Sequence, residues 1–303
     1  MNAVVVGAAG FIGSFLTERL LADGWAVDAV DDLSTGSLAN LADARAMGAN
    51  LTIHTLDASS EEFASLVSLR TPSVIYHLGV VPPGPAAERT AASSMRSLFG
   101  VLEAARAVGG VKVVVALPAV ALYGDVASKD LPLKEGHPWS PVGVCGVLAR
   151  TVADLLVVYR EEHAVEFTAL ALTNVYGPRQ RPDGGVVGAF ARALADRTAP
   201  QIAGEGRQTR DLLFIDDAVD ALVRASSKGG GLVVNVGTGV ATSIRDLWTL
   251  MAGPDGARPQ AVTRRHDDVD RFALSVTRAR IHLAWAPWTD LEVGLRQLGH
   301  RRT

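Results

Sequence analysis

The sequence feature that most constrains the fold is a glycine-rich turn that follows the first apolar run. Residues 2–7 form a short run rich in β-branched side chains, which predicts a buried strand. Gly10 and Gly13 come next, and residues 14–22 repeat apolar positions at helical spacing. In such a unit Gly7 permits the tight turn, Gly10 lets backbone N–H groups approach a phosphate, and Gly13 lets the helix pack against the strand. The segment therefore predicts a dinucleotide-binding α/β fold.

Two adjacent aspartates follow the second predicted strand. Residues 25–30 are mainly apolar, and Asp31 and Asp32 come directly after them, about twenty residues beyond the glycines. A carboxylate at this position accepts hydrogen bonds from the adenosine ribose of a dinucleotide. No arginine follows at once, so the sequence favours NAD over NADP as the cofactor. The alternative is that both aspartates are ordinary solvated turn residues.

Composition and charge limit the other classes of protein. The 303 residues are 48% hydrophobic and carry a net charge of −3, which suits one large α/β domain with a smaller lobe, or two domains. This charge gives no reason to expect nucleic acid or a membrane as a partner, and no apolar run is long enough to span a bilayer. The single cysteine, Cys145, excludes an intramolecular disulfide. The low cysteine content and the lack of a charged leader before the first strand favour a cytoplasmic location.

Strands and helices alternate along the rest of the first half. Strands are predicted at residues 51–56, 74–78 and 111–116, and a long helix at 86–108. Asp57, after the third strand, either contacts the adenine or caps the next helix. The residues expected to contact the cofactor are Gly7, Gly10, Phe11, Ile12, Gly13, Asp31, Asp32, Asp57, Ala58, Leu78 and Gly79.

Later motifs complete a resemblance to a known family. These motifs lie at residues 173–179, 204–211, 214–217, 235–239 and 283–295. With these motifs and the N-terminal half taken together, the chain resembles the extended short-chain dehydrogenase/reductases of the nucleotide-sugar epimerase/dehydratase family. The resemblance is to UDP-glucose 4-epimerase-like members. The resemblance covers nearly the whole chain.

The resemblance implies a fold and a division into domains. The expected fold is a Rossmann-type, doubly wound, mostly parallel sheet of seven strands, with helices on both faces and a smaller C-terminal substrate lobe. An NAD-binding domain is expected at residues 1–171. The substrate lobe is expected mainly at 172–303, with parts of 205–240 returning to the first domain.

The resemblance also implies a nucleotide sugar, or a similar anionic metabolite, as the ligand of the lobe. Asn174 falls where the family contacts the sugar or the diphosphate, and Arg210 and Arg265 match the family's diphosphate-binding arginines. A guanidinium fork suits phosphate oxygens. Each arginine could equally form a structural ion pair.

The family's catalytic residues are not found at their positions. Family members use a tyrosine as the base, a lysine four residues later, and a serine or threonine after the fifth strand. Here these positions hold Val142, Gly146 and Ala119, and the family's asparagine on the long helix is replaced by Ser94. No tyrosine in the chain is followed by a lysine four residues later. Tyr123 is a weak candidate for a substitute base.

These absences shape the prediction of function. A positioned acid or base typically contributes about 10²–10⁴-fold to a rate, and valine, alanine and glycine cannot exchange protons. The sequence therefore favours an NAD-binding protein with a nucleotide-sugar pocket that acts as an atypical enzyme. The alternative is a non-catalytic, ligand-binding or partner-regulating protein, and an ordinary 4-epimerase or 4,6-dehydratase is placed last.

A stripe of apolar residues suggests a homodimer. The predicted helix at 144–163 carries apolar positions at helical spacing, and with the helix at 86–108 it would form a four-helix interface, as the resemblance implies. Ordinary packing against the sheet explains the same stripe.

Overall fold

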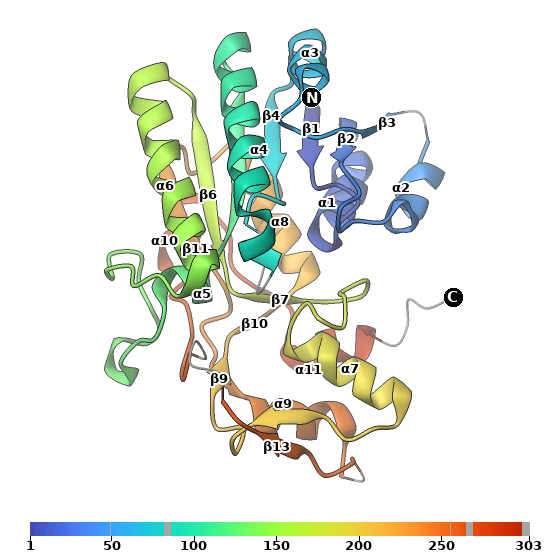
Figure 1. Ribbon diagram of the computed structural model, residues 1–303, viewed down its shortest axis with the longest axis vertical. Helices are drawn as coiled ribbons and strands as arrows, with labels where there is room; N and C mark the ends of the chain where they lie inside the picture. Colours follow the sequence, from blue (N-terminus) through green and yellow to red (C-terminus); the bar gives the residue numbers. More distant parts are fainter. Residues whose placement is uncertain (49, 82–85, 255, 265–268, 299–303) are drawn as a thin grey trace.

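The computed structural model describes residues 1–48, 50–81, 86–254, 256–264 and 269–298, and at its centre lies one parallel sheet (Figure 1). Its seven strands run in the order β11-β6-β5-β4-β1-β2-β3, and every pairing is parallel. Their short, nearly continuous apolar runs suit a sheet that is buried on both faces. The strands are β1 (Asn2–Val6), β2 (Ala26–Asp31), β3 (Leu51–Thr55), β4 (Val74–His77), β5 (Lys112–Pro118), β6 (Phe167–Leu172) and β11 (Leu232–Val236).

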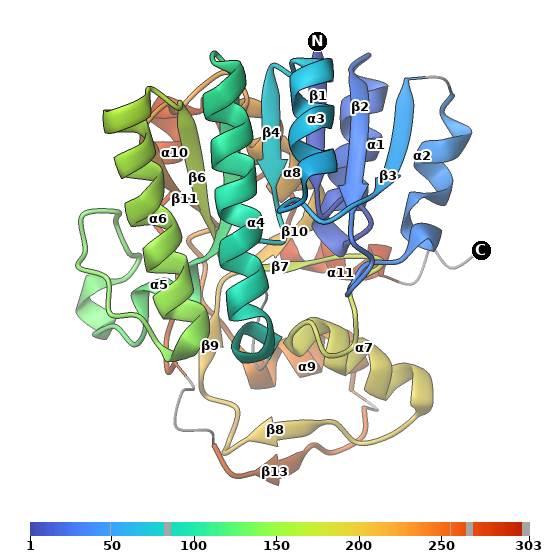
Figure 2. The ribbon, with the colours of Figure 1, turned by 45° about the horizontal axis from the view of Figure 1, so that its top comes forward.

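Helices cover both faces of this sheet (Figure 2). On one face, α3, α4 and α6 pack side by side; they are α3 (Glu61–Arg70), α4 (Ala86–Val108) and α6 (Gly143–His163). The other face carries α1 (Phe11–Ala22), η1 (Leu38–Leu41), α2 (Ala42–Ala46), α8 (Ile215–Ala225) and α10 (Thr277–His282). Each face has its own cluster of buried apolar side chains. The expected Rossmann-type, doubly wound fold is confirmed.

The remaining elements gather at the carboxyl ends of the strands (Figure 1). Three small strand pairs lie there: β7 (Asn174–Tyr176) with β10 (Leu212–Phe214), β8 (Gln201–Ala203) with β13 (Gln260–Val262), and β9 (Thr209–Arg210) with β12 (Thr242–Ser243). The helical elements are α5 (Ala119–Tyr123), η2 (Ser128–Asp130), α7 (Val186–Asp196), α9 (Ile244–Ala252) and α11 (Leu291–Gln297). Phe190 of α7 packs edge-on against Trp248 of α9, with ring centroids 5.1 Å apart.

Two elements from residues 205–240 pack with the expected first domain. β11 pairs with β6, and α8 packs against α1. Both come from the range 205–240 that the sequence expects to return to the first domain. The division at residue 171 remains a prediction.

The first helix begins three residues earlier than its apolar spacing predicts. Gly10 adopts an extended conformation (φ −78°, ψ −179°) as the N-cap, and α1 starts at Phe11. A Cβ on Gly13 would lie 2.0 Å from the carbonyl oxygen of Gly7. The helix can therefore pass this close to the end of β1 only because residue 13 has no side chain.

The buried carboxylate of Asp211 ties three segments together. It accepts hydrogen bonds from the N–H and hydroxyl of Thr238, the N–H of Gly239 and the N–H of Leu274, at 2.6 to 3.0 Å. The residue is fully buried, and burial raises the pKa of its carboxyl although these donors lower it. One side chain thus joins β10 to the loop after β11 and to the chain near residue 274.

The first prediction concerns this junction. Asp211→Asn should lower the free energy of unfolding by about 2–3 kcal/mol, because an amide NH2 group would face backbone donors and leave them unsatisfied. Urea unfolding measures the change. The matched control is Asp196→Asn, an exposed partner of Arg192 on α7, which should leave the stability unchanged. Equal stability of the two variants would contradict the role given to Asp211.

Candidate functional site

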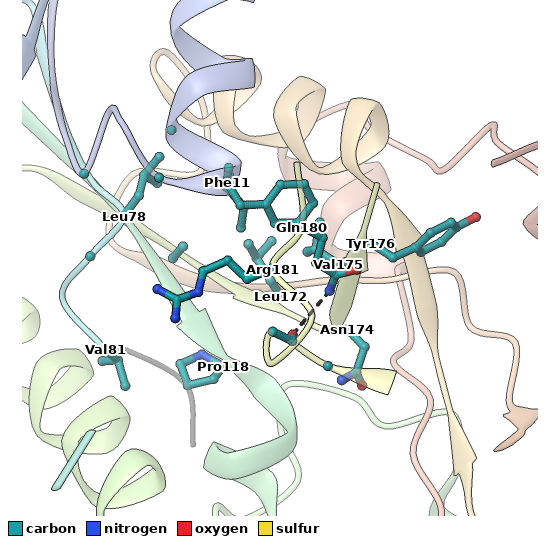
Figure 3. Close-up of a pocket in the computed structure, with 18 of the residues that line it drawn as sticks. Phe11, Leu78, Val81, Pro118, Leu172, Asn174, Val175, Tyr176, Gln180 and Arg181 are labelled. Atoms are coloured by element: carbon teal, nitrogen blue, oxygen red, sulfur yellow. Dashed lines mark hydrogen bonds between the residues drawn. The ribbon is translucent and has the colours of Figure 1, made fainter. Parts of the chain in front are cut away.

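A cavity of about 380 Å³ lies at the carboxyl ends of the central strands (Figure 3). Residues at the carboxyl ends of β1, β4, β5 and β6, or directly after them, line it on one side, and residues between 173 and 187 line much of the rest. Ligands of open α/β sheets bind at this edge, where the strand order reverses direction. In this sheet the reversal falls between β1 and β4.

The glycine turn and the first residues of α1 form one end of the cavity. Its wall there contains Gly7, Gly10, Phe11, Ile12 and Gly13. The first turn of a helix leaves its N–H groups without intrahelical acceptors, and the helix dipole adds partial positive charge. This end of the cavity therefore suits a diphosphate, as the sequence predicts.

Asp31 lies on the same wall. Its carboxylate accepts hydrogen bonds from the N–H groups of Ala9 and Leu33, both at 2.8 Å. Burial raises the pKa of the carboxyl, and these two donors lower it. The side chain still borders the cavity, so it is placed to accept hydrogen bonds from a ribose.

The other residues expected to contact the cofactor divide into two groups. Leu78 and Gly79 line the cavity, whereas Asp32, Asp57 and Ala58 do not belong to its wall. Asp32 accepts hydrogen bonds from the N–H and hydroxyl of Ser34, and Asp57 accepts one from the N–H of Ser59. These are local turn and capping contacts. For these three residues, cofactor contact remains a prediction.

The residues expected to contact the substrate are also divided. Asn174 lines the cavity, and its Oδ1 is buried without a hydrogen-bond partner among the residues described. An unpaired buried acceptor is costly unless a ligand supplies a donor. Arg210 instead donates to the carbonyl oxygens of Thr209 and Val269 and is not on the cavity wall. Arg265 lies outside the described residues.

Ala119, Tyr123 and Ser94 do not line the cavity. Ala119 and Tyr123 are fully buried in a small apolar cluster beside the sheet, and Ser94 is buried on α4. The hydroxyl of Tyr123 donates to Oδ1 of Asn235 at 2.9 Å. Burial raises the pKa of this phenol, which disfavours the phenolate that a base would need. The geometry gives Tyr123 no access to a ligand in this cavity.

Val142 and Gly146 lie at the start of α6, where this helix packs closely against α5. Val142 is the N-cap, and its N–H donates to the carbonyl oxygen of Ala121 at 2.8 Å. Gly146 is buried, and a Cβ built on it would lie 2.2 Å from that same oxygen. The spacing between α5 and α6 therefore leaves no room for any side chain at residue 146. The sequence could not show this, because the contact joins residues 25 positions apart.

One part of the cavity wall was not predicted from the sequence. Gln180, Arg181, Gly184 and Gly185 line it from the loop between β7 and α7, opposite Thr35 in the loop after β2. The glycine pair at 184–185, just after the 173–179 motif, was the available signal.

The fold and this cavity define the class of protein. The profile of the NAD dependent epimerase/dehydratase family matches residues 3–237. The chain belongs to this family, which confirms the resemblance seen in the sequence and, at the level of the family, the expectation of NAD.

Individual relatives cover almost the entire chain. A UDP-glucose 4-epimerase of Mycolicibacterium smegmatis is 38% identical over 97% of this chain and 96% of its own length. The crystal structure of UDP-glucose 4-epimerase with UDP-glucose from Thermotoga maritima superimposes with a TM-score of 0.89 at 30% identity, covering 98% of this chain and 97% of that one. UDP-glucose 4-epimerase of Thermus thermophilus in complex with NAD gives a TM-score of 0.88 at 25% identity, covering the same shares.

These relatives correct the predicted function. From the sequence, an ordinary nucleotide-sugar 4-epimerase was ranked behind an atypical enzyme and a non-catalytic protein. This ranking is wrong, because a relative similar over the whole chain and structures of the same fold are UDP-glucose 4-epimerases. The ranking gave three positions more weight than the rest of the pocket.

Among the described residues, none of the helices combines the length and the hydropathy that a membrane-spanning segment requires. No group of three or more histidine, cysteine, aspartate or glutamate side chains in the same part of the chain could hold a metal ion. The cytoplasmic location remains a prediction.

The second prediction tests the contact between α5 and α6. In a helix, glycine to alanine ordinarily stabilises by up to about 1 kcal/mol. Gly146→Ala should instead destabilise the protein by about 1–3 kcal/mol, because the new methyl group would overlap the carbonyl of Ala121. Thermal and urea unfolding give the sign.

The control for this prediction is Gly136→Ala. A Cβ on Gly136 meets nothing within 4 Å, so its unfolding curve should stay close to that of the unchanged protein. A stabilised Gly146→Ala variant would show that α6 does not pack against α5 as described.

Proposed function

We propose that this protein binds NAD and a UDP-hexose in the cavity between the sheet and the elements at its carboxyl edge, and that it interconverts UDP-glucose and UDP-galactose. One observation carries the proposal: a single cavity joins the glycine turn at one end to Asn174 at the other. A chain with 38% identity over nearly the same length is a UDP-glucose 4-epimerase, which supports the substrate class.

Residues of the chain would divide the work along this cavity. The first turn of α1 would neutralise the diphosphate of the cofactor, and Asp31 would accept hydrogen bonds from the adenosine ribose. The Oδ1 atom of Asn174 would accept a hydrogen bond from the nucleotide sugar. NAD, when bound, supplies a hydride acceptor for the carbon that is oxidised.

The rate of the reaction depends on how the proton leaves the sugar hydroxyl. Ala119, Val142 and Gly146 carry no group that exchanges protons. For these positions, the expectation of a degenerate active site stays a prediction.

The third prediction tests the reaction. Purified protein with NAD and UDP-galactose should form UDP-glucose, which proton NMR distinguishes by its sugar signals over a long incubation. Asn174→Ala should lower kcat/KM about tenfold through the lost hydrogen bond to the ligand. Arg192→Ala, a surface change on α7, should not alter it. If NADH and UDP raise the melting temperature of the protein but no UDP-galactose is converted, the proposed reaction is overturned.

We also propose that the protein forms a homodimer through α4 and α6. These helices pack side by side, and their outer faces expose Phe99, Val144, Val147 and Val158. Other apolar positions of α6, Leu148 and Tyr159 among them, are buried in the monomer. The stripe seen in the sequence therefore serves both purposes: part of it packs inside the monomer, and part is available to a second copy.

The fourth prediction tests this interface. Val147 is 56% exposed on α6, and Val147→Glu should convert a dimer into a monomer, because it places a charge in an apolar contact. Sedimentation velocity measures the association. Leu69→Glu is the matched control, since Leu69 is 79% exposed on α3. An identical association state for both variants would contradict the proposed face.

A further inference from the structure

The loop at residues 177–185 connects β7 to α7 and forms the cavity wall that faces α1. Its shape is held by internal hydrogen bonds. The side-chain amide of Gln180 donates to the carbonyl oxygens of Val175 and Gly184, and the N–H of Gly184 donates to that of Arg181. The Oε1 atom of Gln180 is buried without a partner among the described residues. The wall thus contains an acceptor that a ligand could satisfy.

Arg179 anchors this loop to the other side of the cavity. Its guanidinium donates to Glu18 and Ser14 on α1, at 2.6 and 3.2 Å, and to Asp43 on α2. It also lies over the ring of Phe15, 4.6 Å from the centroid. The side chains of Arg179 and Glu18 are only 17% and 18% exposed, so this ion pair is better shielded from solvent than an ordinary surface pair, whereas Asp43 is largely exposed. The loop is therefore fixed to the helix whose first turn lines the cavity.

Two positions further on, Arg181 extends into the cavity (Figure 3). Its Nε and Nη2 atoms pair with the two carboxylate oxygens of Asp183, both at 2.9 Å, and its Nη1 donates to the carbonyl oxygen of Thr35 at 3.4 Å. Thr35 lies in the loop that follows Asp31. Arg181 thus spans from the substrate side of the cavity to the cofactor side.

The positive charge of Arg181 favours an anionic ligand in the cavity. On the described cavity wall, Arg181 is the one cationic side chain. The diphosphate of a dinucleotide carries two negative charges, while a helix N-terminus contributes only partial positive charge. A guanidinium that is already aimed into the cavity is suited to supply the rest through charge-assisted hydrogen bonds.

We propose that Arg181 is a cofactor-binding residue that pairs with the diphosphate of the dinucleotide, and that Arg179 positions it by fixing the 177–185 loop to α1 and α2. This inference rests on the cofactor part of the proposed function. Asp183 then acts against binding, because its carboxylate occupies the guanidinium of Arg181 and adds negative charge beside the site.

The test is a titration with NADH, followed by the fluorescence of the dinucleotide. Arg181→Ala should raise the Kd for NADH about five- to twentyfold. Arg192→Ala, which removes another paired arginine from the neighbouring helix α7, should leave the Kd unchanged. Added salt should weaken binding to the unchanged protein more than binding to Arg181→Ala. Equal Kd values for the two variants would overturn the proposal.

Two further arms identify the ligand group. ADP-ribose, which keeps the diphosphate but lacks nicotinamide, should lose affinity for Arg181→Ala by the same factor as NADH. UDP should bind the variant and the unchanged protein equally; a loss confined to UDP would assign Arg181 to the substrate and overturn the proposal. Asp183→Asn should lower the Kd for NADH about two- to fivefold by releasing Arg181.

A double-mutant cycle tests the positioning role of Arg179. Arg179→Gln should weaken NADH binding, and adding Arg181→Ala to it should cause little further loss, because both changes remove the same contact. Arg179→Lys should restore part of the affinity. Additive losses would show that Arg179 acts on α1 independently, which would overturn its role as the residue that positions Arg181.

The outcomes separate this inference from the proposed reaction. A protein that binds NADH with an affinity dependent on Arg181, yet converts no UDP-galactose, would support the inference and overturn the reaction. A protein that converts UDP-galactose, with an NADH affinity indifferent to Arg181, would do the reverse. No NADH binding by the unchanged protein would overturn both.

Discussion

The structure depends most on the close contact between the end of β1 and the first turn of α1. A Cβ atom on Gly13 would lie 2.0 Å from the carbonyl oxygen of Gly7, which is closer than any two such atoms can approach. β1 lies between β4 and β2 inside the sheet. The turn after β1 therefore sets where the first residues of α1 lie at the end of the cavity. The N–H groups of that helix can face a diphosphate only while the turn stays this tight.

A second requirement is that the two sides of the cavity keep a fixed distance and orientation, because groups that act on one ligand must be held in a defined geometry. Here the connection is made by side chains as well as by the chain itself. Asp211 binds the β10 region to the loop after β11, while Arg179 binds the 177–185 loop to α1 and α2. Both are charged groups with well-satisfied partners, which suits buried or half-buried positions.

Much of the fold could be predicted because its signals are local. Short apolar strands that alternate with amphipathic helices specify a parallel sheet covered on both faces, and the cofactor end of the cavity follows from consecutive residues such as Gly10 and Gly13. The predicted function was less successful. Its ranking rested on Ala119, Val142 and Gly146, whereas the similarity to a UDP-glucose 4-epimerase extends over nearly the whole chain.

The sequence by itself determined the order of strands and helices, the glycine turn and Asp31 at the end of β2, because each depends on neighbours a few residues away. Only the tertiary structure decided that Arg181 reaches Thr35, and that residue 146 has no space for a side chain. The physical reason is that these contacts join segments distant in the sequence. Their spacing is set by the packing of helices and loops, which no local pattern of residues encodes.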